Sequence, residues 1–349
     1  MLRLRYWLWP LLYVLSLVYG LGIWLWRITQ VRKSKQHYAC GLLAVGNLAV
    51  GGTGKTPHVL YLLEWLQKNR PKSRLGMLSR GYGRKTKGYL EASIDHTATE
   101  LGDEPYQVFR TMAKQVRVFV SENRHVALAK HESDLDWVVL DDAYQQLSLQ
   151  PRLNILLSDF QKPFYEDKLL PLGRLREQAL QAKRADCLII TKCPNDLSEL
   201  QQEHLKSQSI PYLKPNTAIF FSHIVYAPYR PLNELAKTFT AKSFWLLSGI
   251  AQYQGFEQHA RSQLHVLGCK HLSDHVFYTQ ELILSIKKEF LASSQSHTAI
   301  LTTEKDAVKL LSEPLASLLA DIPVFFWPIS VSFGQDTEAF HDFLDKKLK

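Results

Sequence analysis

The stretch that decides the fold is Gly46-Asn47-Leu48-Ala49-Val50-Gly51-Gly52-Thr53-Gly54-Lys55-Thr56-Pro57. An apolar run at 42–45 precedes it and an amphipathic run at 56–68 follows it, which predicts a strand, a glycine-rich loop and a helix in that order. Glycines let the backbone turn so tightly that successive N–H groups and the helix N-terminus point at phosphate oxygens. The sequence therefore predicts a phosphate-binding loop.

Within this loop the lysine and the threonine have distinct expected tasks. Lys55 would reach the β and γ phosphates of a nucleotide, and the Thr56 hydroxyl would bind Mg²⁺. The strict pattern G-x-x-x-x-G-K-[ST] is not matched at its first position, where Ala49 stands. Its last three positions are matched by Gly54-Lys55-Thr56. A glycine-rich turn that caps a helix by chance is the alternative. We expect a nucleoside triphosphate to contact Ala49, Val50, Gly51, Gly52, Thr53, Gly54, Lys55 and Thr56.

A metal site beside such a loop needs a carboxylate at the end of a neighbouring strand. The apolar run 137–140 ends on Asp141 and Asp142, which supply two. The alternative is that these two acids only mark the exposed start of a loop and bind no metal.

From residue 39 onward short apolar runs alternate with amphipathic stretches, which is typical of βα units and a largely parallel sheet. The expected strands are 42–45, 75–78, 116–120, 137–140, 154–157 and 187–191, with helices at 56–68 and 105–113, and a second set of strands at 244–247, 299–302 and 324–327. We expect an α/β fold of the P-loop NTPase type, a mostly parallel sheet with helices on both faces. The expected parts are a membrane-anchoring helix with its basic flank at 1–36, a nucleotide-binding domain at 37–225 and a smaller α/β domain at 226–349 that closes over the site.

The chain length and the cysteines agree with this organisation. A chain of 349 residues has room for two domains with sizeable cores. The four cysteines include no C-x-x-C pair, so the sequence suggests neither a disulfide framework nor a zinc site. A reducing compartment fits this cysteine usage.

The net charge of +9 belongs mainly to the N-terminal part of the chain. Residues 1–63 contain seven Lys or Arg and no acid, whereas the other 286 residues carry a net charge of only +2. Six of the seven basic residues flank an apolar segment, and the seventh is Lys55. The net positive charge of the chain therefore gives little reason to expect a nucleic-acid partner.

The apolar segment runs from Tyr6 to Trp26 without a charge and, as a helix, would be roughly 31 Å long, which matches the hydrocarbon core of a bilayer. Two tryptophans stand near each end, where such rings favour the headgroup boundary. A cleaved signal peptide would have a shorter apolar core, and a buried helix would not be apolar all round. Basic residues after the segment outnumber those before it, so we expect the globular part in the cytoplasm. Pro10, Gly20 and Gly22 leave open whether the segment spans the bilayer or lies in one leaflet.

Other motifs bear on the kind of phosphate chemistry. A GTPase would carry an Asn/Thr-Lys-x-Asp quartet, but Thr191-Lys192-Cys193-Pro194 ends on proline. A kinase needs a group that deprotonates the acceptor hydroxyl, and the stretches 102–105 and 273–275 contain candidate acids and a histidine. The stretch 79–84 combines arginines, which pair with phosphate, with a tyrosine that can stack on a sugar. The alternative for the stretches 102–105 and 273–275 is that their acids and histidine are solvated or only cap helices. The alternative for 79–84 is a solvated basic turn.

Taken in order, these motifs resemble the tetraacyldisaccharide 4'-kinase family of lipid A synthesis over nearly the whole chain. After the N-terminal apolar segment, the matching blocks are GNLAVGGTGKTP (46–57), SRGYGRKTKG (79–88), GDEP (102–105), LDDAYQQ (140–146), LPLGRLRE (170–177), SDH (273–275) and TTEKDAVKL (302–310). The resemblance implies ATP-dependent, Mg²⁺-assisted phosphorylation of the 4'-hydroxyl of a tetraacylated glucosamine disaccharide 1-phosphate. It places this reaction on a lipid-linked substrate at the cytoplasmic face of the inner membrane, with no obligate protein partner evident.

The same resemblance implies roles for individual residues. Asp103 and His275 would form the catalytic pair, with Asp103 as the base. Thr56, Glu104 and one of Asp141 or Asp142 would hold Mg²⁺ directly or through water. The acceptor would be contacted by Arg80, Tyr82, Arg84 and Arg176.

Two blocks depart from the family pattern. Gln146 stands where the family has a histidine, so the role of that histidine is absent or moved. Leu272-Ser273 stands where the family has phenylalanine-alanine, and the Asp274-His275 pair that follows is kept. A membrane-recruited ATPase switch without a small-molecule acceptor remains the alternative function.

Overall fold

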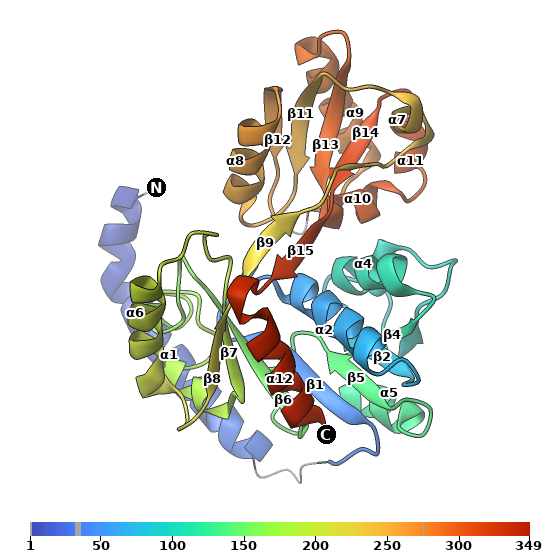
Figure 1. Cartoon of the computed structure of the whole chain (residues 1–349). Helices are drawn as coiled ribbons and strands as arrows, with labels where there is room; N and C mark the ends of the chain where they lie inside the picture. The colour runs from blue at the N-terminus through green and yellow to red at the C-terminus, as the bar shows by residue number, and fades with distance from the viewer. Residues whose placement is uncertain (1, 32–35, 275) are drawn as a thin grey trace. The chain divides into compact units, whose positions relative to one another are not determined.

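The computed structural model describes residues 2–31, 36–274 and 276–349, and contacts divide the chain into two compact units (Figure 1). Unit 1 comprises residues 1–79, 124–224 and 331–349. Unit 2 comprises residues 80–123 and 225–330. The predicted catalytic residue His275 lies outside the described residues.

Unit 1 is built on six parallel strands in the order β2-β5-β1-β6-β7-β8. Their bounds are β1 Gly41–Asn47, β2 Leu75–Ser79, β5 Trp137–Leu140, β6 Leu153–Asp159, β7 Cys187–Thr191 and β8 Ala218–Phe221. The five strands predicted in this unit are confirmed, and β8 is an addition to them. All strands run the same way, so their carboxyl ends meet at one edge of the sheet, where ligands of α/β proteins bind.

Helices cover both faces of this sheet. In Figure 1, α2 (Lys55–Asn69) and α12 (Thr337–Leu348) lie over one face, and the rings of Phe220 in β8 and Phe340 in α12 are 5.0 Å apart. The next strand residue, Phe221, points to the opposite face and belongs to the cluster that includes Leu188 and Ile190. That second face is covered by η1 (Ala179–Arg184), α6 (Glu199–Ser209) and η2 (Ile210–Tyr212). The unit also contains α5 (Arg124–His131), η3 (Gly334–Asp336) and the N-terminal helix α1 (Leu2–Val31).

Unit 2 contains a smaller sheet in the order β10-β14-β13-β11-β12. Four of its strands are parallel, namely β11 Ser243–Ser248, β12 Val266–His271, β13 Thr298–Thr303 and β14 Val324–Trp327, and β10 Arg230–Pro231 is antiparallel. Its helices are α7 Glu234–Thr238, α8 Tyr253–Gln263, α9 Gln280–Ser293, α10 Glu304–Leu310 and α11 Leu315–Leu318. The three strands predicted here are confirmed as β11, β13 and β14.

The earlier segment of unit 2 contains β3 (Leu90–Glu91), α3 (Ala98–Leu101), α4 (Asp103–Met112) and β4 (Val116–Val120). It belongs with the later segment because Leu101, Tyr106 and Val120 form one buried cluster with Val308 of α10. This grouping differs from the predicted consecutive domains at 37–225 and 226–349. A second difference is that residues 331–349 belong to unit 1, where α12 covers the sheet. The two short strands β9 (His223–Tyr226) and β15 (Ile329–Ser332) pair with each other where the chain changes unit.

The N-terminal segment is a single long helix, α1 (Leu2–Val31). Among the described residues it is the one helix long and apolar enough to cross a membrane, with a mean hydropathy of 1.8 over Leu8–Gln30. Its large apolar side chains are mostly exposed, including Leu17 and Val18 at 57% and 62%. One stripe faces protein instead, and Ser16 in the middle of the helix is only 7% exposed.

Candidate active site

The phosphate-binding loop lies at the carboxyl end of β1, and α2 begins at Lys55, one residue before the start predicted from the sequence. Gly51 and Gly54 have φ values of 109° and 82°, in the left-handed region that favours glycine. Inside the loop, Asn47 Nδ2 donates to Thr53 Oγ1 at 2.8 Å. Thr191 at the end of β7 donates to the Thr53 carbonyl at 3.0 Å. The loop is therefore held in its tight turn by side chains from two strand ends.

Lys192 adds a charged support to the same loop. Its ammonium donates to the Gly52 carbonyl and pairs with Asp159 Oδ2 at 3.1 Å. Burial lowers the pKa of Lys192 more than the neighbouring Asp159 raises it, and the net direction is down. Thr191 and Lys192, which do not belong to a guanine-binding motif, thus support the phosphate loop.

Asp142 connects the loop lysine to the predicted acceptor arginine. Lys55 Nζ is 3.8 Å from Asp142 Oδ1, and Arg176 Nη1 donates to Asp142 Oδ2 at 2.9 Å. Burial alone would raise the pKa of Asp142, but Lys55 and Arg176 lower it, and the net direction is down. Asp142 is therefore held as a carboxylate between two cations.

Asp141 lies deeper, 3% exposed, with its Oδ2 accepting a hydrogen bond of 3.3 Å from Ser79 Oγ. Both aspartates are fixed through their backbone by Arg124, which donates to the Asp141 and Asp142 carbonyls at 2.7 and 3.0 Å. Gln146 accepts from Arg124 at 3.5 Å and donates to Ser148 at 2.9 Å. Gln146, which replaces the family histidine, thus contacts Arg124, the residue that holds the backbone of Asp141 and Asp142.

The acids of GDEP lie at the start of α4 in unit 2, where two lysines of α10 meet them. Lys309 Nζ is 3.6 Å from Asp103 Oδ2 and 2.9 Å from Asp306. Lys305 Nζ is 3.2 Å from Glu104 and 3.4 Å from Asp274. Burial lowers the pKa of Lys305, but the surrounding carboxylates raise it more. Asp103, Glu104 and Asp274 are therefore gathered around a pair of ammonium groups.

The stretch that carries Arg80, Tyr82 and Arg84 forms a loop in unit 2. Arg80 is exposed, and Tyr82 is 71% exposed. The Arg84 guanidinium is buried and donates to Glu122 Oε1 at 2.6 Å and to the Gly88 carbonyl. Arg80 and Tyr82 are thus accessible, whereas Arg84 is bonded to Glu122 and Gly88 within its own unit.

Known proteins resemble this chain over nearly its whole length. Residues 8–349 match the family model described as Tetraacyldisaccharide-1-P 4'-kinase. The chain belongs to this kinase family. The resemblance seen in the ordered motifs is thereby confirmed.

Individual members of the family align over most of their length. The tetraacyldisaccharide 4'-kinase of Phocaeicola vulgatus is 32% identical and covers 97% of this chain and 93% of the relative. That of Flavobacterium psychrophilum is 36% identical and covers 90% and 88%. A crystal structure of LpxK from Aquifex aeolicus in complex with ATP has a TM-score of 0.72 at 25% identity, covering 99% of this chain and 100% of that one. The fold class predicted from the sequence is therefore confirmed.

The structure brings together more residues than the family motifs single out. In unit 1, Lys55, Asp142 and Arg176 are in contact, and Asn47, Gln145 and Lys192 support them. In unit 2, Lys305 and Lys309 are additional members of the acidic cluster. Their spacing of four residues on one helix face was a usable signal, because it sets two cations side by side.

His58 on α2 is a buried imidazole next to the phosphate loop. Its Nδ1 lies 2.7 Å from the Gly54 carbonyl and its Nε2 3.0 Å from Ser222 Oγ. Burial lowers the pKa of His58 to about 4. The ring therefore stays neutral in the folded protein at a pH where the unfolded chain, with a pKa near ~6.5, takes up a proton.

The free energy of unfolding should consequently fall as the pH decreases from about 6.5 to about 4. The expected slope is about 1.4 kcal/mol per pH unit, or about 2 kcal/mol between pH 6.5 and 5. Urea unfolding of the full chain in detergent micelles measures it, and His58→Gln should lose this part of the slope. His204→Gln on the exposed side of α6 is the matched control. Equal slopes in all three proteins would contradict the prediction.

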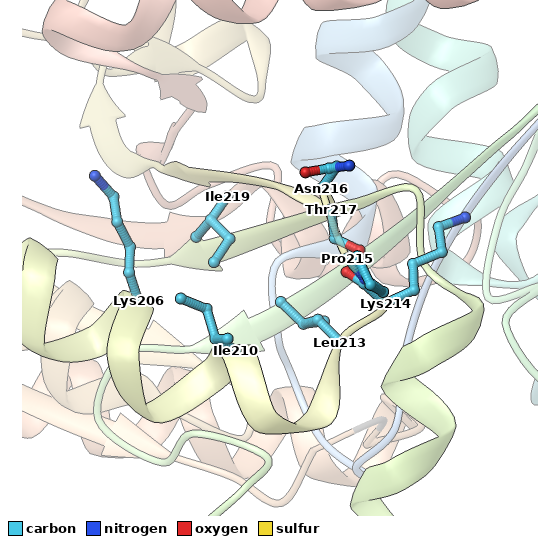
Figure 2. Close-up of a pocket in the computed structure, with 8 residues that line it drawn as sticks. All are labelled: Lys206, Ile210, Leu213, Lys214, Pro215, Asn216, Thr217 and Ile219. Atoms are coloured by element: carbon cyan, nitrogen blue, oxygen red, sulfur yellow. The ribbon is translucent and has the colours of Figure 1, made fainter.

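A pocket of about 580 Å³ lies elsewhere in unit 1, between α6, η2 and the start of β8. Figure 2 shows Ile210, Leu213 and Ile219 close together, with Lys206 and Lys214 on opposite sides. Both lysines already pair with acids, Glu203 and Asp186. The pocket includes none of the predicted site residues, and the phosphate loop remains the candidate active site of this kinase.

Proposed function

We propose that this protein transfers the γ-phosphoryl group of ATP to the 4'-hydroxyl of a tetraacylated glucosamine disaccharide 1-phosphate. The observation that carries the proposal is the phosphate loop at the end of β1, with Lys55 at the start of α2 beside Asp142. Exposed N–H groups and a cation at a helix N-terminus bind polyphosphate. Family membership specifies a kinase, which favours an acceptor alcohol over an ATPase switch.

The oxygen donors beside the loop suit Mg²⁺, a hard cation that prefers carboxylate and hydroxyl oxygens. We assign this role to Thr56 and to one of Asp141 or Asp142, all in unit 1, and Glu104 stays a prediction from the family resemblance. When bound, the ion neutralises charge on the phosphate oxygens. Lys55 adds a fixed positive charge for the γ-phosphate, and the supports from Lys192 and Thr191 keep the loop N–H groups in place.

The acceptor side of the proposal rests on unit 2 and on Arg176. Asp103 would accept the proton of the 4'-hydroxyl, with His275 as its partner. Lys309 Nζ lies 3.6 Å from Asp103 Oδ2, so a cation stands beside the carboxylate that would accept a hydrogen bond from the hydroxyl. Arg80, Tyr82 and Arg176 would contact the phosphorylated sugar, because guanidinium groups pair with phosphate and a tyrosine ring stacks on a pyranose. Arg84 would act by shaping the loop that presents Tyr82.

A transfer assay tests this function directly. ATP labelled in the γ-phosphate is incubated with the full chain, Mg²⁺ and tetraacyl disaccharide 1-phosphate in mixed micelles. We expect the label on the lipid, at the 4' position. Label that appears only as inorganic phosphate, at a rate independent of the lipid, would instead establish the ATPase switch.

We further propose that α1 holds the enzyme at the cytoplasmic face of the inner membrane, because the acceptor's acyl chains stay in the bilayer. The exposed apolar side chains of α1 form a continuous surface, which marks a membrane contact. Ser16 and Tyr19 in the middle of the helix donate to backbone carbonyls of unit 1, at 3.0 and 3.1 Å. A helix docked along its length on a water-soluble unit would lie in one leaflet with its opposite face in lipid.

Flotation with vesicles of phosphatidylethanolamine and phosphatidylglycerol tests this anchoring. We expect the full chain to float and Val18→Glu/Leu25→Glu to remain in the dense fraction, since both side chains lie on the exposed face. Each fully buried large apolar side chain contributes about 1.5–3 kcal/mol, so binding should fall more than tenfold. The matched control is Val126→Glu/Leu200→Glu, which places the same charges on exposed positions of α5 and α6. Flotation of the α1 variant at the control level would contradict the anchor.

A further inference from the structure

The N-terminal helix contacts one particular segment of unit 1, residues 169–177, which we call the docking segment. Ser16 Oγ donates to the Leu169 carbonyl at 3.0 Å, and Tyr19 OH donates to the Arg176 carbonyl at 3.1 Å. Gly20 allows the close approach, because a Cβ there would lie 2.9 Å from Leu169 Cδ1. At about 100° per residue these three positions share one helix face. The contact is therefore a continuous seam along α1.

An ion pair closes the seam at the end nearer the basic flank. Arg27 Nη1 lies 2.9 Å from Glu177 Oε2, and Glu177 is 1% exposed. Glu177 also pairs with Arg184 at 2.9 Å, and Arg184 donates to the Tyr144 carbonyl at 2.7 Å. Tyr144 follows the Asp141-Asp142 pair by two residues. A charge on α1 is thus linked through Glu177 and Arg184 to the backbone two residues after Asp142.

The other side of the docking segment is bonded to the phosphate loop. Leu175 forms a bridge with Ala49. Arg176 N donates to the Leu48 carbonyl at 2.7 Å, and Val50 N donates to the Arg174 carbonyl at 2.8 Å. The Arg176 guanidinium in turn pairs with Asp142. The docking segment therefore lies between α1 and the loop, and one residue of it, Arg176, is bonded to both.

We propose that Ser16 and Tyr19 are positioning residues for phosphoryl transfer. By fixing the backbone of the docking segment they fix the Arg176 guanidinium against Asp142 and brace the start of the phosphate loop. The N-terminal helix then has a role in the chemical step as well as in anchoring. The expected effect on phosphoryl transfer rests on the proposed function. The expected effect on the backbone of the docking segment rests on the hydrogen bonds alone.

The test uses Ser16→Ala/Tyr19→Phe in the full chain, in detergent micelles. This double variant removes both hydroxyls without changing the charge. Tyr13→Phe is the matched control, because Tyr13 is 46% exposed on the same helix and its ring stacks on Trp9, a contact that phenylalanine keeps. Hydrogen–deuterium exchange is followed at 169–177 and, for reference, at β7. We expect exchange at 169–177 to rise about tenfold in the double variant, with β7 and the control unchanged.

Kinetics separate positioning from anchoring. We expect kcat for transfer to the lipid to fall about three- to tenfold with the KM for ATP unchanged. A rise only in the KM for the lipid, at unchanged kcat, would mean that the two residues serve the anchor alone and would overturn the proposal. Unchanged exchange at 169–177, or an equal change in Tyr13→Phe, would also overturn it. Wild-type protein that transfers no phosphate to lipid would remove the proposed function, while the exchange comparison would still decide whether α1 holds the docking segment.

Discussion

Replacement of Lys55 by alanine is expected to reduce phosphoryl transfer at least about a hundredfold. The side chain leaves the start of α2, 3.8 Å from Asp142, and with it goes the cation that would stabilise charge on the transferred group. Initial rates in the mixed-micelle assay measure the loss. ATP binding, measured by titration calorimetry, should weaken as well, because the ammonium would contact the phosphates before and during transfer.

A matched control comes from the other end of the same helix. Lys68→Ala removes an exposed ammonium from the last turn of α2 and should leave kcat within about twofold. Melting temperatures of both variants should stay close to wild type, since neither lysine is in the core. Transfer by Lys55→Ala at the Lys68→Ala rate would show that the loop does not act on the phosphates.

Replacement of Asp103 by alanine is expected to remove most turnover, about a hundredfold to ten-thousandfold, and to leave ATP binding nearly intact. The phosphate loop belongs to unit 1, whereas Asp103 opens α4 in unit 2, so the nucleotide contacts should survive. Single-turnover transfer and ATP calorimetry, carried out on the same preparation, separate the two effects.

Two comparisons sharpen the Asp103 experiment. Asp103→Asn keeps the shape of the side chain but cannot take up the proton, so it should be nearly as slow as Asp103→Ala. Asp95→Asn changes an exposed aspartate of the same segment and should be close to wild type. Turnover by Asp103→Asn near the wild-type rate would exclude Asp103 as the base.

The local elements could be predicted from the sequence because each is encoded by a short pattern. The strand, loop and helix around Gly51 and Gly54 follow from apolar spacing and from glycines that adopt positive φ. The strand that ends on Asp141 and Asp142 was readable in the same way. These patterns act over about ten residues, so they do not depend on the rest of the fold.

The long-range groupings could not be read in this way. The stretch 80–123 joins unit 2 because Leu101 and Tyr106 pack with Val308, a contact between residues about two hundred positions apart. Lys192 looked like part of a failed guanine motif, and its bond to the Gly52 carbonyl has no local signature. Lys305 and Lys309 stood in a recognised block, but their partners Glu104 and Asp103 lie on another helix.

The interrupted course of the chain has a consequence for how the protein folds during synthesis. Domains of a growing chain generally fold as units, beginning at the N-terminus. Here the six strands of unit 1 are complete at Phe221, but α12 emerges only after the whole of residues 225–330. Until then Phe220 lacks the ring of Phe340, and the part of this sheet face that α12 covers is exposed in a chain still on the ribosome. A nascent chain of this enzyme should therefore depend on chaperones until its last helix has been released, and a fragment that ends near residue 225 should aggregate rather than fold.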